Sequence, residues 1–262
     1  MKAGAADDEQ SVAVACRFVR GHNALLCEGD FGPVFVDLYL QLGQNGVVLE
    51  GGLDEQLKHL VAALVLHAAS RPHDETCAWT VHFDESPGLN LFAVAENPTG
   101  RVTGRVLTED VRKTGADVLH AETAVPGHGP RRSSVEFSGR DVLRAIDAFY
   151  ARSEQRMARF FRLGGDRFAL LAAQPDCNEE WLALADKEEV CRLADDVSRP
   201  PMETRFYRWE CGCSPEKIAS AIGPALSGDL DGVFAGDDFI RVNCPRCGTR
   251  HEIGRGEFEK LP

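Results

Sequence analysis

The sequence predicts an α+β protein: an N-terminal domain of mixed sheet and helix, a helical linker and a small C-terminal α+β module. Three observations predict this organisation. Strand-like and helix-like patterns alternate through the first part of the chain, the composition turns acidic after Pro175, and four of the nine cysteines form two close pairs near the C-terminus. We therefore expect a domain at 1–175, a linker at 176–205 and a module at 206–262.

Hydrophobic periodicity predicts the elements of the N-terminal domain. Runs rich in Val and Phe predict strands at 12–19 and 34–40. Over 54–69 apolar side chains recur at the spacing of one helix face. Alternating apolar and polar residues within 76–107, broken by turns, predict an antiparallel meander. The remaining predicted elements are a helix from Ser138 to about Gln155, with Asp141 in a capping box, and a hairpin over 157–173.

Composition and charge exclude several classes of function. The 262 residues are 44% hydrophobic and carry 29 basic against 41 acidic side chains, a net charge of −12. This charge argues against nucleic acid and anionic membranes as partners. The longest apolar stretch, Leu60 to Leu66, is too short to span a bilayer, and the acidic N-terminus lacks a signal-peptide core. We therefore expect a cytoplasmic protein.

The expected linker is acidic and partly helical. Residues 176–199 hold eight acidic and three basic side chains, and the apolar residues in their second half keep helical spacing until Pro200. Cys177 and Cys191 lie in this segment. They are either small apolar side chains or additional redox-sensitive thiols. Cys16, Cys27 and Cys77 lie in strand-like contexts and are expected in the core.

The remaining cysteines have the spacing of metal ligands. Cys211-Gly-Cys213 and Cys244-Pro-Arg-Cys247 are separated by thirty residues. Four thiolates complete the tetrahedral shell that Zn²⁺ prefers and leave no open position for a catalytic water. A module of about 50 residues has little core of its own and needs such a staple. We therefore predict one structural Zn²⁺ on these four cysteines.

Between the pairs, Ser214-Pro215-Glu216 predicts a helix start, and Val233-Phe234 with 239–242 predict a hairpin. His251 is expected to be a surface or strand residue, because four thiolates already suffice. Residues 211–262 carry six basic and eight acidic side chains, so the module lacks the charge of a nucleic-acid zinc ribbon.

The cysteine pairs allow two interpretations. The metal site is either a fixed staple or a redox-sensitive centre, since metal-bound thiolates can be nucleophiles toward peroxide. Two cysteines one residue apart can form only a strained, readily reduced disulfide, which favours the redox interpretation. No Gly-x-Ser-x-Gly elbow, phosphate-binding loop or nucleophile–base set is present. We therefore do not expect an enzyme.

At these residues the sequence resembles the heat-shock protein 33 family, the redox-regulated 33 kDa chaperonins. The resemblance is carried by CGCS and CPRCG in the C-terminal module and by FYARSEQ at 149–155. It implies an ATP-independent holdase that protects unfolding proteins from aggregation under oxidative stress. The same resemblance implies Zn²⁺ held by Cys211, Cys213, Cys244 and Cys247 in the reduced state.

On oxidation, the resemblance implies disulfides Cys211–Cys213 and Cys244–Cys247, release of the metal and homodimer formation. The alternative is a non-enzymatic binding protein in which a four-cysteine zinc staple is purely structural. The oxidant, the clients and the oligomeric state when reduced do not follow from the sequence.

Overall fold

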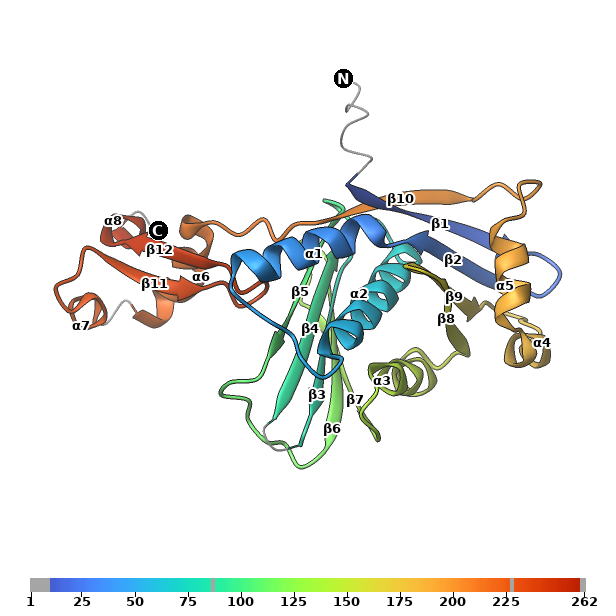
Figure 1. Cartoon of the computed structure of the whole chain (residues 1–262), viewed down its shortest axis with the longest axis horizontal. Helices are drawn as coiled ribbons and strands as arrows, with labels where there is room; N and C mark the ends of the chain where they lie inside the picture. Colours follow the sequence, from blue (N-terminus) through green and yellow to red (C-terminus); the bar gives the residue numbers. More distant parts are fainter. Residues whose placement is uncertain (1–9, 86–87, 227–228, 260–262) are drawn as a thin grey trace, which may run out of the picture.

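The predicted α+β class is confirmed by a computed structural model, which describes residues 10–85, 88–226 and 229–259 (Figure 1). The strands are β1 (Ser11–Val19), β2 (Ala24–Asp30), β3 (Thr76–Phe83), β4 (Leu89–Glu96), β5 (Arg101–Leu107), β6 (Asp117–Ala124), β7 (Arg131–Phe137), β8 (Ala158–Gly164), β9 (Arg167–Ala173), β10 (Glu203–Trp209), β11 (Phe239–Asn243) and β12 (Arg250–Gly254). The helices are α1 (Gly32–Gln44), α2 (Leu53–Ala69), α3 (Val142–Phe149), α4 (Glu179–Leu184), α5 (Lys187–Ala194), α6 (Pro215–Leu226), α7 (Leu230–Phe234) and α8 (Arg255–Glu259).

The first ten strands form one sheet in the order β7-β6-β3-β4-β5-β10-β1-β2-β9-β8. The predicted meander is β3–β4–β5, and the predicted hairpin is β8–β9. Strand β10 lies between β1 and β5, antiparallel to the first and parallel to the second. It therefore joins the β7-β6-β3-β4-β5 part of the sheet to the β1-β2-β9-β8 part, immediately before the chain enters the cysteine-rich module.

Helix α2 packs in the main core of the sheet. All the apolar residues that predicted it are buried: Leu57, Leu60, Val61, Leu64, Val65 and Ala68. They share one cluster with side chains from β1 to β6, α1 and α3. No helix in the described part of the chain is long and apolar enough to cross a membrane.

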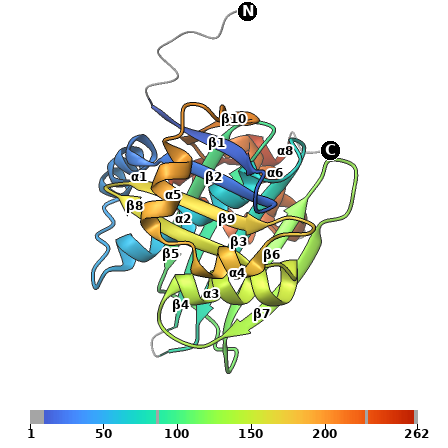
Figure 2. The ribbon, with the colours of Figure 1, turned by 90° about the vertical axis from the view of Figure 1, so that its right-hand side faces the viewer.

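The acidic linker helices cover the opposite face of the same sheet. In β9, Phe168 and Leu170 belong to the core around α2, whereas Ala169 and Leu171 belong to a second cluster with side chains of α4 and α5. Figure 2 shows α4 and α5 in front of β8 and β9, with α2 behind them. Because β10 spans 203–209, one strand of the sheet contains residues on both sides of the expected boundary at 206. The division into 1–175, 176–205 and 206–262 stays a prediction.

The prediction of a strand at 34–40 is wrong, because this segment belongs to helix α1. Pro33 occupies its first turn, and Val34, Phe35 and Leu38 are buried on one side. Val36 and Leu40 face away and are exposed. Valine and phenylalanine favour strands in general, but here packing against the sheet selects a helix.

The third helix begins later than predicted. Asp141, rather than Ser138, is its N-cap, and the Asp141 carboxylate accepts a hydrogen bond from the Leu143 N–H at 2.9 Å. After Phe149 the helix widens into a single π turn over Tyr150–Glu154 and ends at Gln155, which has a left-handed φ of 52°. The FYARSEQ segment therefore forms this irregular end.

Buried His67 makes the stability of the domain pH-dependent. Its Nδ1 lies 2.9 Å from the Tyr150 hydroxyl, and burial lowers the pKa of His67 to about 3. The unfolded chain takes up this proton near pH 6.5, so unfolding becomes more favourable as the pH falls from about 6.5 toward 3. We expect His67 to contribute up to about 1.4 kcal/mol per pH unit to this loss. Chemical denaturation at several pH values measures the free energy of unfolding against pH, and the slope of this plot should be shallower in His67→Gln. His120→Gln changes an exposed residue of β6 and should keep the wild-type slope. An unchanged slope in His67→Gln would contradict the assignment.

Candidate metal centre

The C-terminal module has a small separate core at one end of the molecule, next to α1 and away from α4 and α5 (Figure 1). Helix α6 begins where Ser214-Pro215 predicted it. The predicted hairpin at 233–242 is wrong, because Val233 and Phe234 belong to α7 and β11 pairs with β12 instead. The hairpin therefore encloses the Cys244–Cys247 turn.

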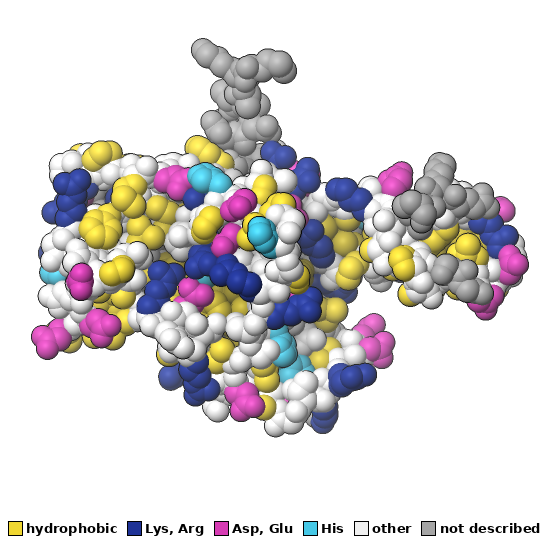
Figure 3. Space-filling model, turned by 180° about the vertical axis from the view of Figure 1, so that it is seen from behind, with side chains coloured by type: hydrophobic (Ala, Val, Ile, Leu, Met, Phe, Trp, Pro, Cys, Tyr) yellow, Lys and Arg dark blue, Asp and Glu magenta, His cyan; other side chains and the backbone are white. Residues whose placement is uncertain are grey.

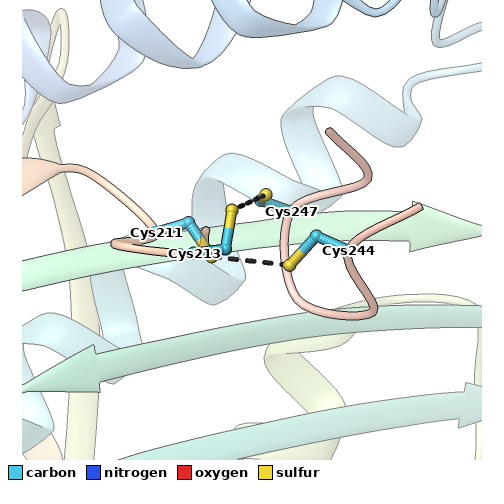
Figure 4. Close-up of side chains that lie close together, drawn as sticks. All are labelled: Cys211, Cys213, Cys244 and Cys247. Atoms are coloured by element: carbon cyan, nitrogen blue, oxygen red, sulfur yellow. Dashed lines mark hydrogen bonds between the residues drawn. The ribbon is translucent and has the colours of Figure 1, made fainter. Parts of the chain in front are cut away.

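The structure brings the four predicted cysteines together, and we call Cys211, Cys213, Cys244 and Cys247 the four-cysteine cluster (Figure 4). The first two lie between β10 and α6, and the other two lie between β11 and β12. All four sulfur atoms lie within 4.8 Å of one another. The Sγ–Sγ distances are 3.7 Å for Cys211–Cys244 and 3.7 Å for Cys213–Cys247.

These distances fit a tetrahedral metal site. Four Zn–S bonds of about 2.3 Å at tetrahedral angles place neighbouring sulfur atoms about 3.8 Å apart. Each of these two sulfur pairs joins a cysteine of the first sequence pair to one of the second, as expected when both turns face one centre. The four-cysteine cluster can therefore bind one metal ion, and its soft thiolate ligands suit Zn²⁺.

Two glycines allow the chain to turn around the four-cysteine cluster. Gly212 and Gly248 have φ angles of 63° and 78°, in the left-handed region. A side chain at Gly212 would in addition approach the Arg101 guanidinium to 2.6 Å. The second turn is closed by hydrogen bonds from Gly248 N–H to the Cys244 carbonyl and from Cys244 N–H to the Thr249 carbonyl, at 2.9 and 2.8 Å. Cys244 to Thr249 thus form a tight turn that closes on the Cys244 backbone.

Without a cation, the four-cysteine cluster does not readily carry four thiolates. A hydrogen bond from Cys211 and contacts with Thr249 lower the pKa of Cys247 to about 4. Contact with Cys247 raises the pKa of Cys211, and burial together with the Cys247 charge raises the pKa of Cys213 to about 12. One thiolate thus forms easily at Cys247, and its charge makes the neighbouring thiols harder to ionise. A divalent cation is the partner that allows all four to ionise.

Sequence reasoning missed two side chains that contact the sulfur atoms. His251 lies in β12 as expected, but its Nε2 is 3.2 Å from Cys213 Sγ. Thr249 Oγ1 lies 3.4 Å from Cys247 Sγ. These contacts orient the sulfur atoms in the way that second-sphere groups orient metal ligands. The alternation of β12 beside CxxC could have placed His251 on the sulfur side of the strand.

The four-cysteine cluster also holds the module against the N-terminal domain. Arg105 in β5 donates to the Cys244 carbonyl at 2.9 Å, and Gln41 in α1 donates to the Cys247 carbonyl at 2.9 Å. Arg246, between the two cysteines, forms a 2.6 Å ion pair with Glu96 of β4. We call residues 244–247 the metal-binding turn. This turn is thus also the contact surface with the sheet and α1.

The other predicted thiols lie elsewhere. Cys16, Cys27 and Cys77 are buried in the main core as expected. Cys177 and Cys191 are half-buried around the linker helices, in the second hydrophobic cluster. Neither belongs to the four-cysteine cluster.

Known relatives resemble this chain over most of its length. It is 22% identical over 215 residues to a 33 kDa chaperonin from Enterobacter sp., covering 70% of this chain and 74% of the relative. A 33 kDa chaperonin from Nitrosococcus oceani is 22% identical over 169 residues, 56% of this chain. This second match spans only 58% of the relative, less than two thirds of its length.

The fold has a counterpart among solved structures. The crystal structure of the 33 kDa chaperonin (heat shock protein 33 homolog) from Thermotoga maritima superposes with a TM-score of 0.69 at 15% identity, covering 96% of this chain and 97% of that one. This likeness shows the fold. No protein-family model matches the chain.

We expect one Zn²⁺ per chain in protein purified under reducing conditions. Cys247→Ser should lose tightly bound zinc, because a serine hydroxyl is a poor substitute for a thiolate ligand. Elemental analysis and a chelator competition assay measure stoichiometry and affinity. Cys177→Ser, outside the four-cysteine cluster, is the control and should keep one zinc.

His251→Ala should also keep one zinc but bind it about 10-fold more weakly, because only an orienting contact is removed. Full zinc retention in Cys247→Ser, or complete loss in His251→Ala, would show that the ligand set is wrong.

Proposed function

Because this chain is a distant member of the 33 kDa chaperonin (heat-shock protein 33) family, we propose that it is an ATP-independent holdase activated by oxidation. In the reduced state Cys211, Cys213, Cys244 and Cys247 hold one Zn²⁺, which keeps the thiolates ionised and the module folded. Oxidation removes these ligands and releases the module. Apolar surface then binds unfolding proteins.

The observation that carries this proposal is the contact between the metal-binding turn and the N-terminal domain. The Cys244 and Cys247 carbonyls accept hydrogen bonds from Arg105 and Gln41 only while the turn keeps its shape. Zinc binding contributes on the order of 10–16 kcal/mol to the folding of such modules, as much as the net stability of a whole domain. Loss of the thiolates should therefore unfold the turn and undock it.

Exposure favours Cys211 and Cys213 as the first sulfur atoms to react. Both are half-buried, whereas Cys244 and Cys247 are buried. Cys211 and Cys213 border a cavity of about 370 Å³, which Cys244 also lines. One sulfur attacks hydrogen peroxide, which breaks the O–O bond and leaves a sulfenic acid and hydroxide. The second sulfur displaces hydroxide from the sulfenic acid and closes the disulfide, so two electrons pass from sulfur to peroxide. Cys244–Cys247 would close in the same way with a second peroxide.

Undocking would enlarge an apolar surface that is already partly exposed. Val36, Tyr39 and Leu40 of α1 are exposed in the docked state, as is Val48 in the loop after α1. Between α1, β5 and the metal-binding turn lies a cavity of about 340 Å³ that includes Leu42 and Trp209 in its walls; undocking would open it.

Further apolar side chains are exposed around the linker. Val197, Met202 and Phe206, in and before β10, are exposed. On the face shown in Figure 3, hydrophobic side chains gather at the end of the molecule away from the C-terminal module. Exposed apolar patches of this kind suit clients that present unfolded, apolar segments.

The remaining parts of the proposal follow from the family. We propose that the oxidised protein forms homodimers, acts in the cytoplasm and has no catalytic activity. Its partners are unfolding proteins rather than nucleic acid or membranes, in keeping with the net charge of −12.

Peroxide treatment of the reduced, zinc-loaded protein at mildly elevated temperature tests the proposal. We expect zinc release, loss of the four cluster thiols and suppression of client aggregation, measured by metal-indicator absorbance, thiol titration and light scattering. A reduced sample heated without peroxide is the control. Zinc release and thiol loss with unchanged client aggregation would support the alternative, a purely structural zinc staple.

Removing a docking contact should lower the threshold for activation. Arg105→Ala deletes the hydrogen bond to the Cys244 carbonyl but no thiolate, so zinc stoichiometry should stay at one. A charged hydrogen bond of this kind contributes about 1.5–3 kcal/mol, so activation should occur at a lower temperature or peroxide dose. Light scattering across a peroxide series measures the shift. Arg132→Ala removes an exposed arginine paired with Glu122 and should behave as wild type. If Arg105→Ala is activated at the same temperature and peroxide dose as wild type, docking of the module does not restrain activation.

A further inference from the structure

A second pair of thiols lies inside the N-terminal sheet, far along the sequence from the four-cysteine cluster. Cys16 in β1 and Cys27 in β2 are directly opposite each other in the antiparallel ladder. Their Sγ atoms are 2.6 Å apart, much closer than the 3.7 Å within the four-cysteine cluster. Both side chains are buried in the main core.

We propose that Cys16 and Cys27 form a cross-strand disulfide when the protein is oxidised. The register already places both sulfur atoms on the same face, so the bond needs a shift of only about 0.6 Å to reach the usual S–S length of about 2.05 Å. Nothing has to unfold to bring them together. This redox site goes beyond the proposed function, since neither thiol belongs to the four-cysteine cluster.

The chemistry is a two-electron oxidation by hydrogen peroxide. One thiol is oxidised to a sulfenic acid as the peroxide O–O bond breaks and water leaves. The other thiol displaces the sulfenic oxygen, which leaves as a second water with the remaining proton. The hydrogen bond with Cys16 and burial raise the pKa of Cys27, so Cys27 stays protonated and reacts slowly.

The disulfide would fasten a central part of the sheet. In the ladder, Cys16 is also opposite Glu203 of β10, and Cys27 is opposite Leu170 of β9. The Cys16 carbonyl in addition accepts a hydrogen bond from the Met202 N–H at 2.8 Å, just before β10. The bond would thus join the two strands between β10 and β9, and keep this region folded when the C-terminal module is released.

Peptide mapping of the intact, zinc-loaded protein tests the proposal. The protein is oxidised with peroxide below its unfolding midpoint, denatured with an alkylating agent and digested with trypsin without reduction. Cleavage after Arg17 and Arg20 separates the two cysteines onto different peptides. We expect a linked pair whose mass is the sum of both peptides minus two hydrogens, and which separates on reduction.

Recovery of both cysteines in alkylated form, while Cys211 and Cys213 are oxidised in the same digest, would overturn the proposal. So would a linked pair that forms only after the protein has been unfolded in denaturant. The same digest reports the oxidation state of the four-cysteine cluster, so the two proposed redox sites are tested separately.

Thermal unfolding gives a second measurement. Oxidation should raise the midpoint of the N-terminal domain by about 5 °C more in wild type than in Cys27→Ala, because only wild type gains the cross-link. Cys77→Ala is the matched control: Cys77 is equally buried, but Ala95 and Thr123 lie opposite it, so this variant should keep the full gain. An equal gain in wild type and Cys27→Ala would overturn the proposal.

Discussion

The conformation of the C-terminal module depends on how the charge of four crowded sulfur atoms is balanced. The fold holds them within 4.8 Å of one another, where several thiolates repel strongly and thiols form only weak hydrogen bonds. The rest of the module's core is small, with Ile218, Phe234, Ile253 and Phe258 as its largest buried side chains. A bound divalent cation forms four strong bonds to the crowded sulfur atoms. When thiolate ligands are lost, the sulfur atoms either repel one another or form disulfides.

This local balance can reach the rest of the molecule because the metal-binding turn has two roles. Its side chains supply sulfur ligands, and its backbone carbonyls accept hydrogen bonds from Arg105 and Gln41. The connection from the sheet is short, because Cys211 follows the end of β10 at Trp209 by two residues. The last two residues of β10, Arg208 and Trp209, pair with β5. A change at the sulfur atoms therefore alters the docking contacts directly, without a long chain of intermediate residues.

The sequence predicted those parts of the molecule that depend on local periodicity. Helix α2 and the β3–β4–β5 meander follow from the spacing of apolar residues, and the four-cysteine cluster follows from cysteine spacing. Features that depend on distant partners were missed: packing made 34–40 a helix, and β10 joined the sheet between two strands from distant parts of the chain. The contact of His251 with Cys213 likewise requires the hairpin to be folded before it can be seen.

The two proposed redox sites differ in the properties that decide how fast a thiol reacts. The four-cysteine cluster contains a sulfur that ionises readily, and three of its members, Cys211, Cys213 and Cys244, border a cavity. Cys16 and Cys27 are buried, and the pKa of Cys27 is raised, so Cys27 supplies little thiolate. Peroxide reacts with thiolates rather than thiols, so oxidation should reach the metal centre first and the sheet pair later. In that order the C-terminal module would be released before the strands beside β10 are cross-linked, and the N-terminal domain would gain its disulfide when its apolar surface is already uncovered.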